Sequence, residues 1–171
     1  MDEARFGLIS WHRRRWCPRG FRVPWIVCDQ YEWLWLYAAI EPLSGESFCL
    51  YLPHLNGDCF QVFLNEFQKA YPHDPITMVL DRAPAHRSTK IDWPDHVRPL
   101  SLPAYSPELD PTERLFRELR RPLANEIFDS IELLEDALTN ALKPYWENKS
   151  MLRQLTGYPW WIEAAENIKT G

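Results

Sequence analysis

Two strand-like runs joined by a short link most constrain how this chain can fold. They are rich in aromatic and β-branched residues and span Trp33–Glu41 and Glu46–Leu52. The link between them contains Pro42 and Gly45, which favours a hairpin turn. Such an apolar antiparallel pair has to bury a face, so other elements of the chain must pack on it.

The rest of the chain supplies those elements. Phenylalanines at helical spacing predict an amphipathic helix over Asp58–Tyr71. The apolar run "ITMVL" predicts a buried strand that ends at Asp81. Further strands are predicted at Val23–Cys28 and 97–102. One helix is predicted to begin at Pro111 and to be ended or kinked by Pro122, and another is predicted to begin near Asp129. This order predicts an α/β fold with a mixed sheet flanked by helices.

Length and composition indicate one folded domain. The chain has 171 residues, of which 46% are hydrophobic and 25% charged, so it can bury a core and is not disordered. No apolar run is long enough to span a membrane and no signal peptide opens the sequence. The four cysteines are scattered without a CxxC pair. We therefore expect a cytoplasmic, nucleoid-associated protein with reduced thiols and no membrane partner.

The charge distribution gives two opposing indications about nucleic acid. The net charge of −5 argues against a nucleic-acid partner, because phosphate attracts cations. The stretch between Arg5 and Arg22, however, holds six arginines and no acid. Within it Arg13, Arg14 and Arg15 stand between two tryptophans, a pattern that could lie along DNA. A solvated face is the alternative interpretation.

Acidic residues at the ends of predicted elements are the candidate site. Asp81 ends the central strand, where open α/β sheets place ligands, although it could simply cap the next turn. The stretch "LPAYSPELDPTERLF" contains three prolines, which restrict the backbone before a predicted helix. Asp110, Pro111 and Glu113 fit a capping box there, and we favour a cap for Asp110. Asp2 lies either in a frayed end or inside a strand that was once longer.

Five segments together resemble a known family. They read "DEARFGL", "RRRWCPRG", "YEWLWLYAAIEPLSGESF", "LDRAPAHRS" and "LPAYSPELDPTERLF". In this order they resemble the DDE-superfamily transposases of the mariner-like bacterial insertion-sequence group, from Asp2 to about Leu138. The resemblance implies a ribonuclease-H-like catalytic core whose first strand is truncated here.

The resemblance also implies a site and its partners. Asp2, Asp81 and Glu113 would be catalytic and would hold two Mg²⁺ or Mn²⁺ ions for cleavage and transfer of DNA strands. The DNA partners would be transposon ends and target, and a homodimer or partner transposase subunit is a further expectation. His86 and Arg87 would lie near the DNA phosphates. A structural hydrogen bond is the alternative for His86, and solvation for Arg87.

Departures from the family pattern favour a truncated copy with low or no activity. The 171 residues are expected to form a single catalytic domain that lacks the N-terminal helix-turn-helix region. Asp110 and Arg82 stand where the family commonly has Asn. Asp2 directly follows Met1, and a chain end rarely orders a metal ligand. Two alternatives remain open: an inactive remnant that binds DNA or a transposase subunit, and an unrelated metal-dependent nuclease.

Overall fold

The computed structural model describes residues 1–14, 16–21, 28–103, 106 and 109–170, with only the backbone for 168–170. The predicted strand at Val23–Cys28 falls almost entirely outside the described residues, as does Arg15. In chain order the elements are β1 (Asp2–Gly7), β2 (Trp33–Glu41), β3 (Glu46–Leu52), α1 (Gly57–Ala70), β4 (Ile76–Leu80), the 3₁₀ turn η1 (Pro84–Arg87), β5 (Val97–Ser101), α2 (Thr112–Leu123), α3 (Ile131–Glu147), α4 (Lys149–Thr156) and α5 (Pro159–Thr170).

The strands form one antiparallel and one parallel group. β1, β2 and β3 pair antiparallel in that order, with Asp2 opposite Ala38 and Glu41 opposite Glu46. β4 and β5 pair in parallel. The amino group of Met1 donates a hydrogen bond of 2.8 Å to the carbonyl oxygen of Val79 and so joins β1 to β4. The mixed arrangement predicted from the sequence is confirmed.

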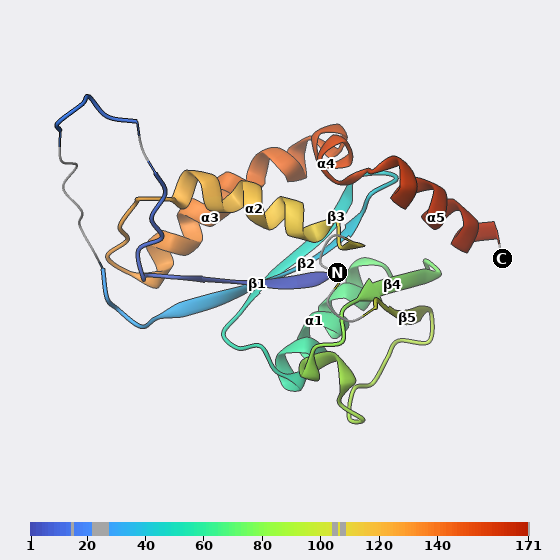
Figure 1. The fold of residues 1–171 in the computed structure, drawn as a ribbon. Coiled ribbons are helices and arrows are strands. Elements are labelled where there is room, and N and C mark those ends of the chain that lie inside the picture. The colour runs from blue at the N-terminus through green and yellow to red at the C-terminus, as the bar shows by residue number, and fades with distance from the viewer. Residues whose placement is uncertain (15, 22–27, 104–105, 107–108, 171) are drawn as a thin grey trace.

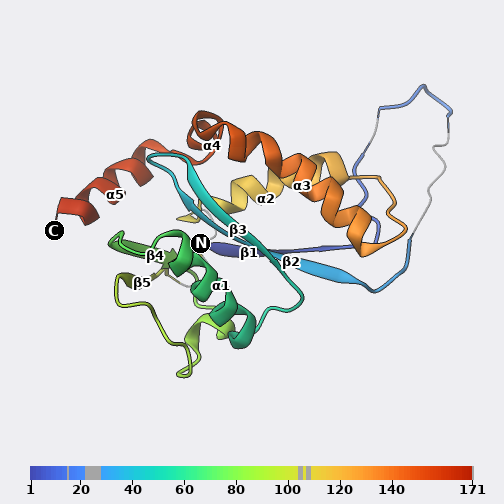
Figure 2. The same ribbon diagram turned by 180° about the vertical axis from the view of Figure 1, so that it is seen from behind.

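Helices cover both faces of the antiparallel sheet. α2, α3 and α4 pack on one face, whereas α1, β4 and β5 lie on the other side (Figures 1 and 2). The side chains of β1 and β2 alternate between these two layers because successive residues of a strand point to opposite faces. Leu36 therefore belongs to the first hydrophobic cluster and Tyr37 to the second.

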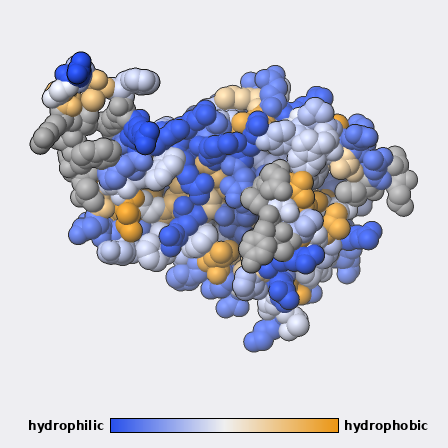
Figure 3. Space-filling view, in the orientation of Figure 1, coloured by the Kyte–Doolittle hydropathy of each residue, from blue (hydrophilic) through white to orange (hydrophobic). Residues whose placement is uncertain are grey.

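The two clusters have different compositions. The first is mostly aliphatic and includes Leu115, Leu119 and Leu138. The second is aromatic: Phe63 lies 5.7 Å from Tyr37 and 5.4 Å from Phe48 between ring centroids. On the face shown in Figure 3, hydrophobic residues among the described part of the chain are scattered between hydrophilic ones. No helix of the described residues is long and apolar enough to cross a membrane.

Candidate active site

Asp2 is held in the sheet rather than at a loose end. It pairs with Ala38 of β2, and its own carboxylate accepts a hydrogen bond of 2.8 Å from the Glu3 N–H. Met1 is buried and hydrogen-bonded to β4. The expectation that Asp2 is poorly held is therefore wrong for the backbone of this residue.

The start of α2 brings two more acids to the same region. Asp110 is buried, and its carboxylate accepts a hydrogen bond of 2.8 Å from the Thr112 N–H. Asp110 thus accepts a bond at the helix start, as a cap would, but Pro111 and not Asp110 occupies the N-cap position and Thr112 is the first helical residue, so the predicted capping box is shifted by one residue. Glu113 follows in the first turn. The hydrogen bond from Thr112 to Asp110 holds the helix start that carries Glu113.

The negative charges of Asp110 and Glu113 act on the Asp2 carboxylate. The pKa of Asp2 is raised from 3.8 to about 7. Burial is the main cause, and the negative charges of Asp110, Glu3 and Glu113 add to it, against a lowering by the Glu3 N–H hydrogen bond. Asp2 in β1 and the two acids at the start of α2, Asp110 and Glu113, thus lie near enough for their charges to interact, and we call these three residues the carboxylate cluster.

We expect this cluster to make stability depend on pH. Because the folded-state pKa of Asp2 is raised, its contribution to the free energy of unfolding falls as pH rises from about 4 to about 7. Asp110→Asn removes a neighbouring charge and keeps an oxygen for the cap. At pH 8, where Asp2 is charged, this variant should raise the free energy of unfolding by about 1 kcal/mol, which corresponds to a little less than a one-unit change in the pKa of Asp2. At pH 5, where Asp2 is mostly protonated, the gain should be smaller.

Urea unfolding at the two pH values measures this effect. Asp136→Asn, a change at an exposed acid of α3, serves as the matched control and should show no such pH dependence. An equal gain for Asp110→Asn at pH 5 and pH 8 would contradict a charge cluster around Asp2.

Asp81 lies in a second group of side chains with His86 and Glu3. Its carboxylate accepts a hydrogen bond of 2.8 Å from the Ala83 N–H, which is the turn cap named as the alternative role for Asp81. The same carboxylate lies 2.9 Å from Nδ1 of His86, and Nε2 of His86 lies 2.8 Å from Oε1 of Glu3. His86 thus connects the end of β4 to β1.

His86 and Glu3 form a buried pair. Their side chains are 1% and 3% exposed, and the His86 ring lies 4.7 Å from that of Phe60. Burial by itself lowers the pKa of His86. The hydrogen bond to Glu3 and the charges of Glu3 and Asp81 outweigh burial, and the net pKa is raised. A ring buried in this way has the structural hydrogen bonds named as the alternative, whereas a direct DNA contact needs an exposed ring.

Glu3 was not among the residues singled out in the sequence. A usable signal was present: in a strand that starts at Asp2, Glu3 must point to the opposite face, toward the aromatic cluster. A buried carboxylate requires a partner, and a histidine was available in the loop after Asp81. Alternation along β1 therefore separates two acids that are adjacent in sequence.

The three predicted metal ligands are distributed over these two groups. Asp2 and Glu113 lie in the carboxylate cluster, whereas Asp81 is turned toward His86. Among the described residues, no three histidine, cysteine or acidic side chains are placed closely enough to hold a metal ion. The donor set itself fits a hard cation, because Mg²⁺ and Mn²⁺ prefer carboxylate oxygens.

The predicted DNA-contacting residues that the structure describes lie at the surface, apart from His86. Arg13, Arg14 and Arg87 are exposed. The Arg13 guanidinium lies 5.7 Å from the centroid of the Trp11 ring, and its backbone N–H donates a hydrogen bond to Asn125.

Two comparisons of sequence place this chain among known proteins. A profile of the DDE superfamily endonucleases matches residues 1–135. The uncharacterised protein y4pE/y4sA of Sinorhizobium fredii is 31% identical over 98 residues, which is 56% of this chain and 73% of that protein.

Solved structures share the fold. The Mos1 transposase paired-end complex with left transposon end has a TM-score of 0.62 at 21% identity, covering 90% of this chain and 51% of that one. The Mos1 strand transfer complex gives 0.62 at 20% identity, covering 89% and 50%. This chain therefore spans about half the length of the Mos1 chains, and the predicted ribonuclease-H-like fold is confirmed. The match over residues 1–135 shows that the chain belongs to the DDE superfamily of endonucleases.

Proposed function

We propose that this chain is a transposase catalytic domain that cleaves and transfers DNA strands during movement of an insertion sequence. The observation that carries the proposal is the carboxylate cluster of Asp2, Asp110 and Glu113 next to β4, the strand that Asp81 follows. Family membership and the Mos1 fold support the reaction class. The 171 residues would act as a single catalytic domain.

In this proposal Asp2, Asp81 and Glu113 hold two divalent cations. Bound Mg²⁺ or Mn²⁺ would supply Lewis acidity for phosphoryl transfer. Mos1 mariner paired-end complexes with Mn and with Mg support the choice of ions. Asp81 would exchange its contact with His86 for a position facing Asp2. His86 and Glu3 would then hold the end of β4 in place from the side of the aromatic cluster, because both side chains are buried there.

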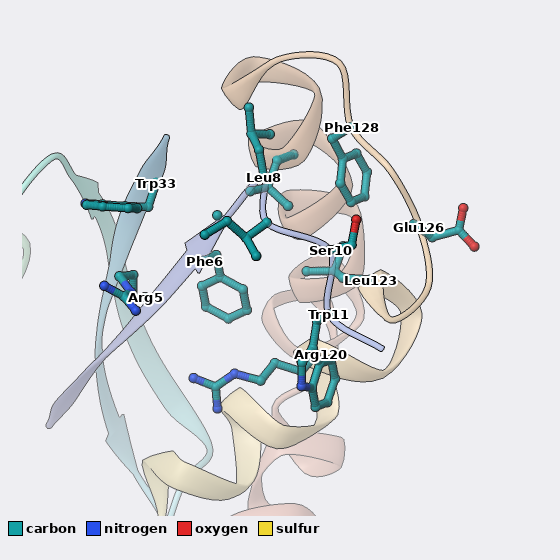
Figure 4. A pocket seen from close by; sticks show the side chains of 13 residues that line it. Arg5, Phe6, Leu8, Ser10, Trp11, Trp33, Arg120, Leu123, Glu126 and Phe128 are labelled. Atoms are coloured by element: carbon teal, nitrogen blue, oxygen red, sulfur yellow. The ribbon is translucent and has the colours of Figure 1, made fainter. Parts of the chain in front are cut away.

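A pocket beside the basic stretch suggests where DNA could bind. It has a volume of about 300 Å³, and Arg5, Trp33, Trp11 and Arg120 are among its lining residues. The Arg5 guanidinium lies 5.0 Å from the centroid of the Trp33 ring. Figure 4 shows these two side chains next to each other, whereas Glu126 points away from the cavity. Arginine and exposed tryptophan are suited to phosphate and base contacts without sequence selectivity. Such binding weakens as salt increases.

The second candidate function is a remnant that binds DNA or a transposase subunit without cleaving. The observation that favours it is the orientation of Asp81, whose carboxylate already has two partners outside the carboxylate cluster. A homodimer or partner subunit and an association with the nucleoid belong to both proposals.

Nicking of supercoiled plasmid tests the main proposal. The purified chain should convert the plasmid slowly to open circles when Mg²⁺ or Mn²⁺ is present, and a chelator should stop the conversion. A gel shift on the same DNA shows separately whether the chain binds. A gel shift that shows DNA binding, combined with no nicking in the presence of either Mg²⁺ or Mn²⁺, would reject the catalytic proposal and support the binding module.

A further inference from the structure

One side of α2 carries a row of charged residues that leads from the carboxylate cluster to the pocket lined by Arg5 and Trp33. The row consists of Glu113, Arg117 and Arg120, at spacings i, i+4 and i+7. Residues at these spacings lie along one side of an α-helix, because each turn has about 3.6 residues. We call this row the α2 track.

Both ends of the α2 track are directed toward β1. At the start of the helix, the charge of Glu113 acts on the Asp2 carboxylate of β1. Near the end of the helix, the Arg120 guanidinium lies 5.4 Å from the centroid of the Phe6 ring of β1. Figure 4 shows the Arg120 side chain reaching from α2 toward that ring. Arg117 stands between these two contacts and therefore lies on the same side of α2.

The two arginines of the α2 track carry charges that no acid neutralises in the described part of the chain. Neither Arg117 nor Arg120 forms a salt bridge with any residue that the structure describes, whereas Arg121 on the same helix is paired with Glu118. Acids are not scarce, since the chain has 24 acidic and 19 basic residues. Arg117 is also exposed. Guanidinium groups in such a row are suited to anionic oxygens that come from outside the chain.

The length of the α2 track fits a chain of phosphates better than a single small anion. An α-helix rises about 1.5 Å per residue, so the backbone from Glu113 to Arg120 spans about 10 Å. One strand of B-DNA advances about 3.4 Å per nucleotide, so the same distance holds about three nucleotides. The pocket with Arg5 and Trp33 begins at Arg120, which is one of its lining residues.

The surface around α2 is open to a ligand of this size. Figures 1 and 2 show α2 in front of α3 on one side of the molecule, and Figure 3 shows mainly hydrophilic residues in that region. The exposed arginines Arg13 and Arg14 belong to the segment that follows β1 and continue the positive charge beyond the pocket.

We propose that the α2 track binds the sugar-phosphate backbone of one DNA strand, which runs from the carboxylate cluster to the pocket with Arg5 and Trp33. Arg117 and Arg120 each bind a phosphate of this strand, and the ring of Phe6 holds Arg120 in position. The proposal rests on the proposed function, since the phosphate at the Glu113 end is then the one to be cleaved. Both arginines bind and align the strand without contacting the reacting phosphate.

The test measures how the affinity for a short B-form duplex depends on salt, by fluorescence anisotropy between about 50 and 200 mM salt. Each phosphate contact contributes about 0.9 to the slope of log K against log salt concentration. Arg117→Gln and Arg120→Gln should each reduce the slope by about 0.9. The double variant should reduce it by about 1.8, because both contacts are made to one bound strand. Arg117→Lys should keep the slope, because the positive charge is retained.

Lys69→Gln is the matched control, since it removes one positive charge from α1 on the other face of the sheet. It should leave the slope unchanged. The thermal midpoint of every variant separates a loss of packing from a loss of binding.

An unchanged slope for Arg117→Gln would overturn the proposal, as would an equal reduction by Lys69→Gln or the absence of measurable binding at low salt. A lower thermal midpoint of Arg120→Gln with an unchanged slope would also overturn it, because Arg120 would then only pack on Phe6. None of these readouts depends on cleavage. The expected slopes without any nicking would support the α2 track and reject only the catalytic proposal.

Discussion

Glu3→Ala is expected to lower the free energy of unfolding by about 3–5 kcal/mol, because it leaves His86 buried without its main partner. His86→Ala should cost a similar amount for the same reason. The double variant should be less destabilised than the sum of the two, since each change removes the same interaction. Urea unfolding of the four proteins gives the coupling energy.

The pH dependence of this loss has a definite sign. The pKa of His86 is raised above 6.5, so the stabilisation from its charged form is complete below pH 6.5 and is lost as pH rises through the folded-state pKa. The cost of Glu3→Ala should therefore be larger at pH 6 than at pH 9.

The Lys69–Glu66 pair is the matched control for Glu3. Its atoms lie 2.6 Å apart, but both side chains are exposed, and Glu66→Ala should change stability by less than about 1 kcal/mol. If Glu3→Ala were no more costly than Glu66→Ala, the buried pair would contribute little to the fold.

Asp81→Ala and Glu113→Ala should each reduce metal-dependent plasmid nicking at least about a hundredfold. A displacement of a catalytic group by about 1 Å can already cost this factor, and the loss of one ligand moves the metal ions and the groups that they hold. Asp2→Ala should have the same effect. Initial rates of open-circle formation at saturating Mg²⁺ or Mn²⁺ provide the measurement.

Asp136→Asn is again the control, since it removes an exposed acid of α3 outside the carboxylate cluster. Circular dichroism should show that the variants with reduced rates remain folded. Brisk nicking by the native chain that Asp2→Ala leaves unchanged would show that Asp2 is not a metal ligand.

Local sequence patterns were sufficient to predict the elements that are bounded by clear turn residues or that have regular hydrophobic periodicity. β2 and β3 have the predicted bounds because a tight turn with Gly45 at positive φ separates two apolar runs. α1 is displaced by one residue from the prediction, since Asn56 caps it. α2 ends at Leu123, directly after Pro122, as predicted.

Other features depend on contacts between distant segments. α3 runs through Pro144 to Glu147, and α4 and α5 follow in a segment for which no elements were predicted. The orientation of Asp81 is set by His86 and, through it, by Glu3, 78 residues earlier. The identities of the acids could be read from the sequence, but their orientation required the packed core.

The alternation of β1 has a consequence for folding fidelity. A shift of β1 by one residue against β2 would exchange the two faces of the strand. Arg5 would then enter the aliphatic cluster that now holds Phe6, and Glu3 would lose His86. Misaligned pairing would thus bury unpaired charges, at a cost of several kcal/mol. The same charges that prepare this region for chemistry therefore act as a check on strand alignment, selecting one pairing while the chain folds.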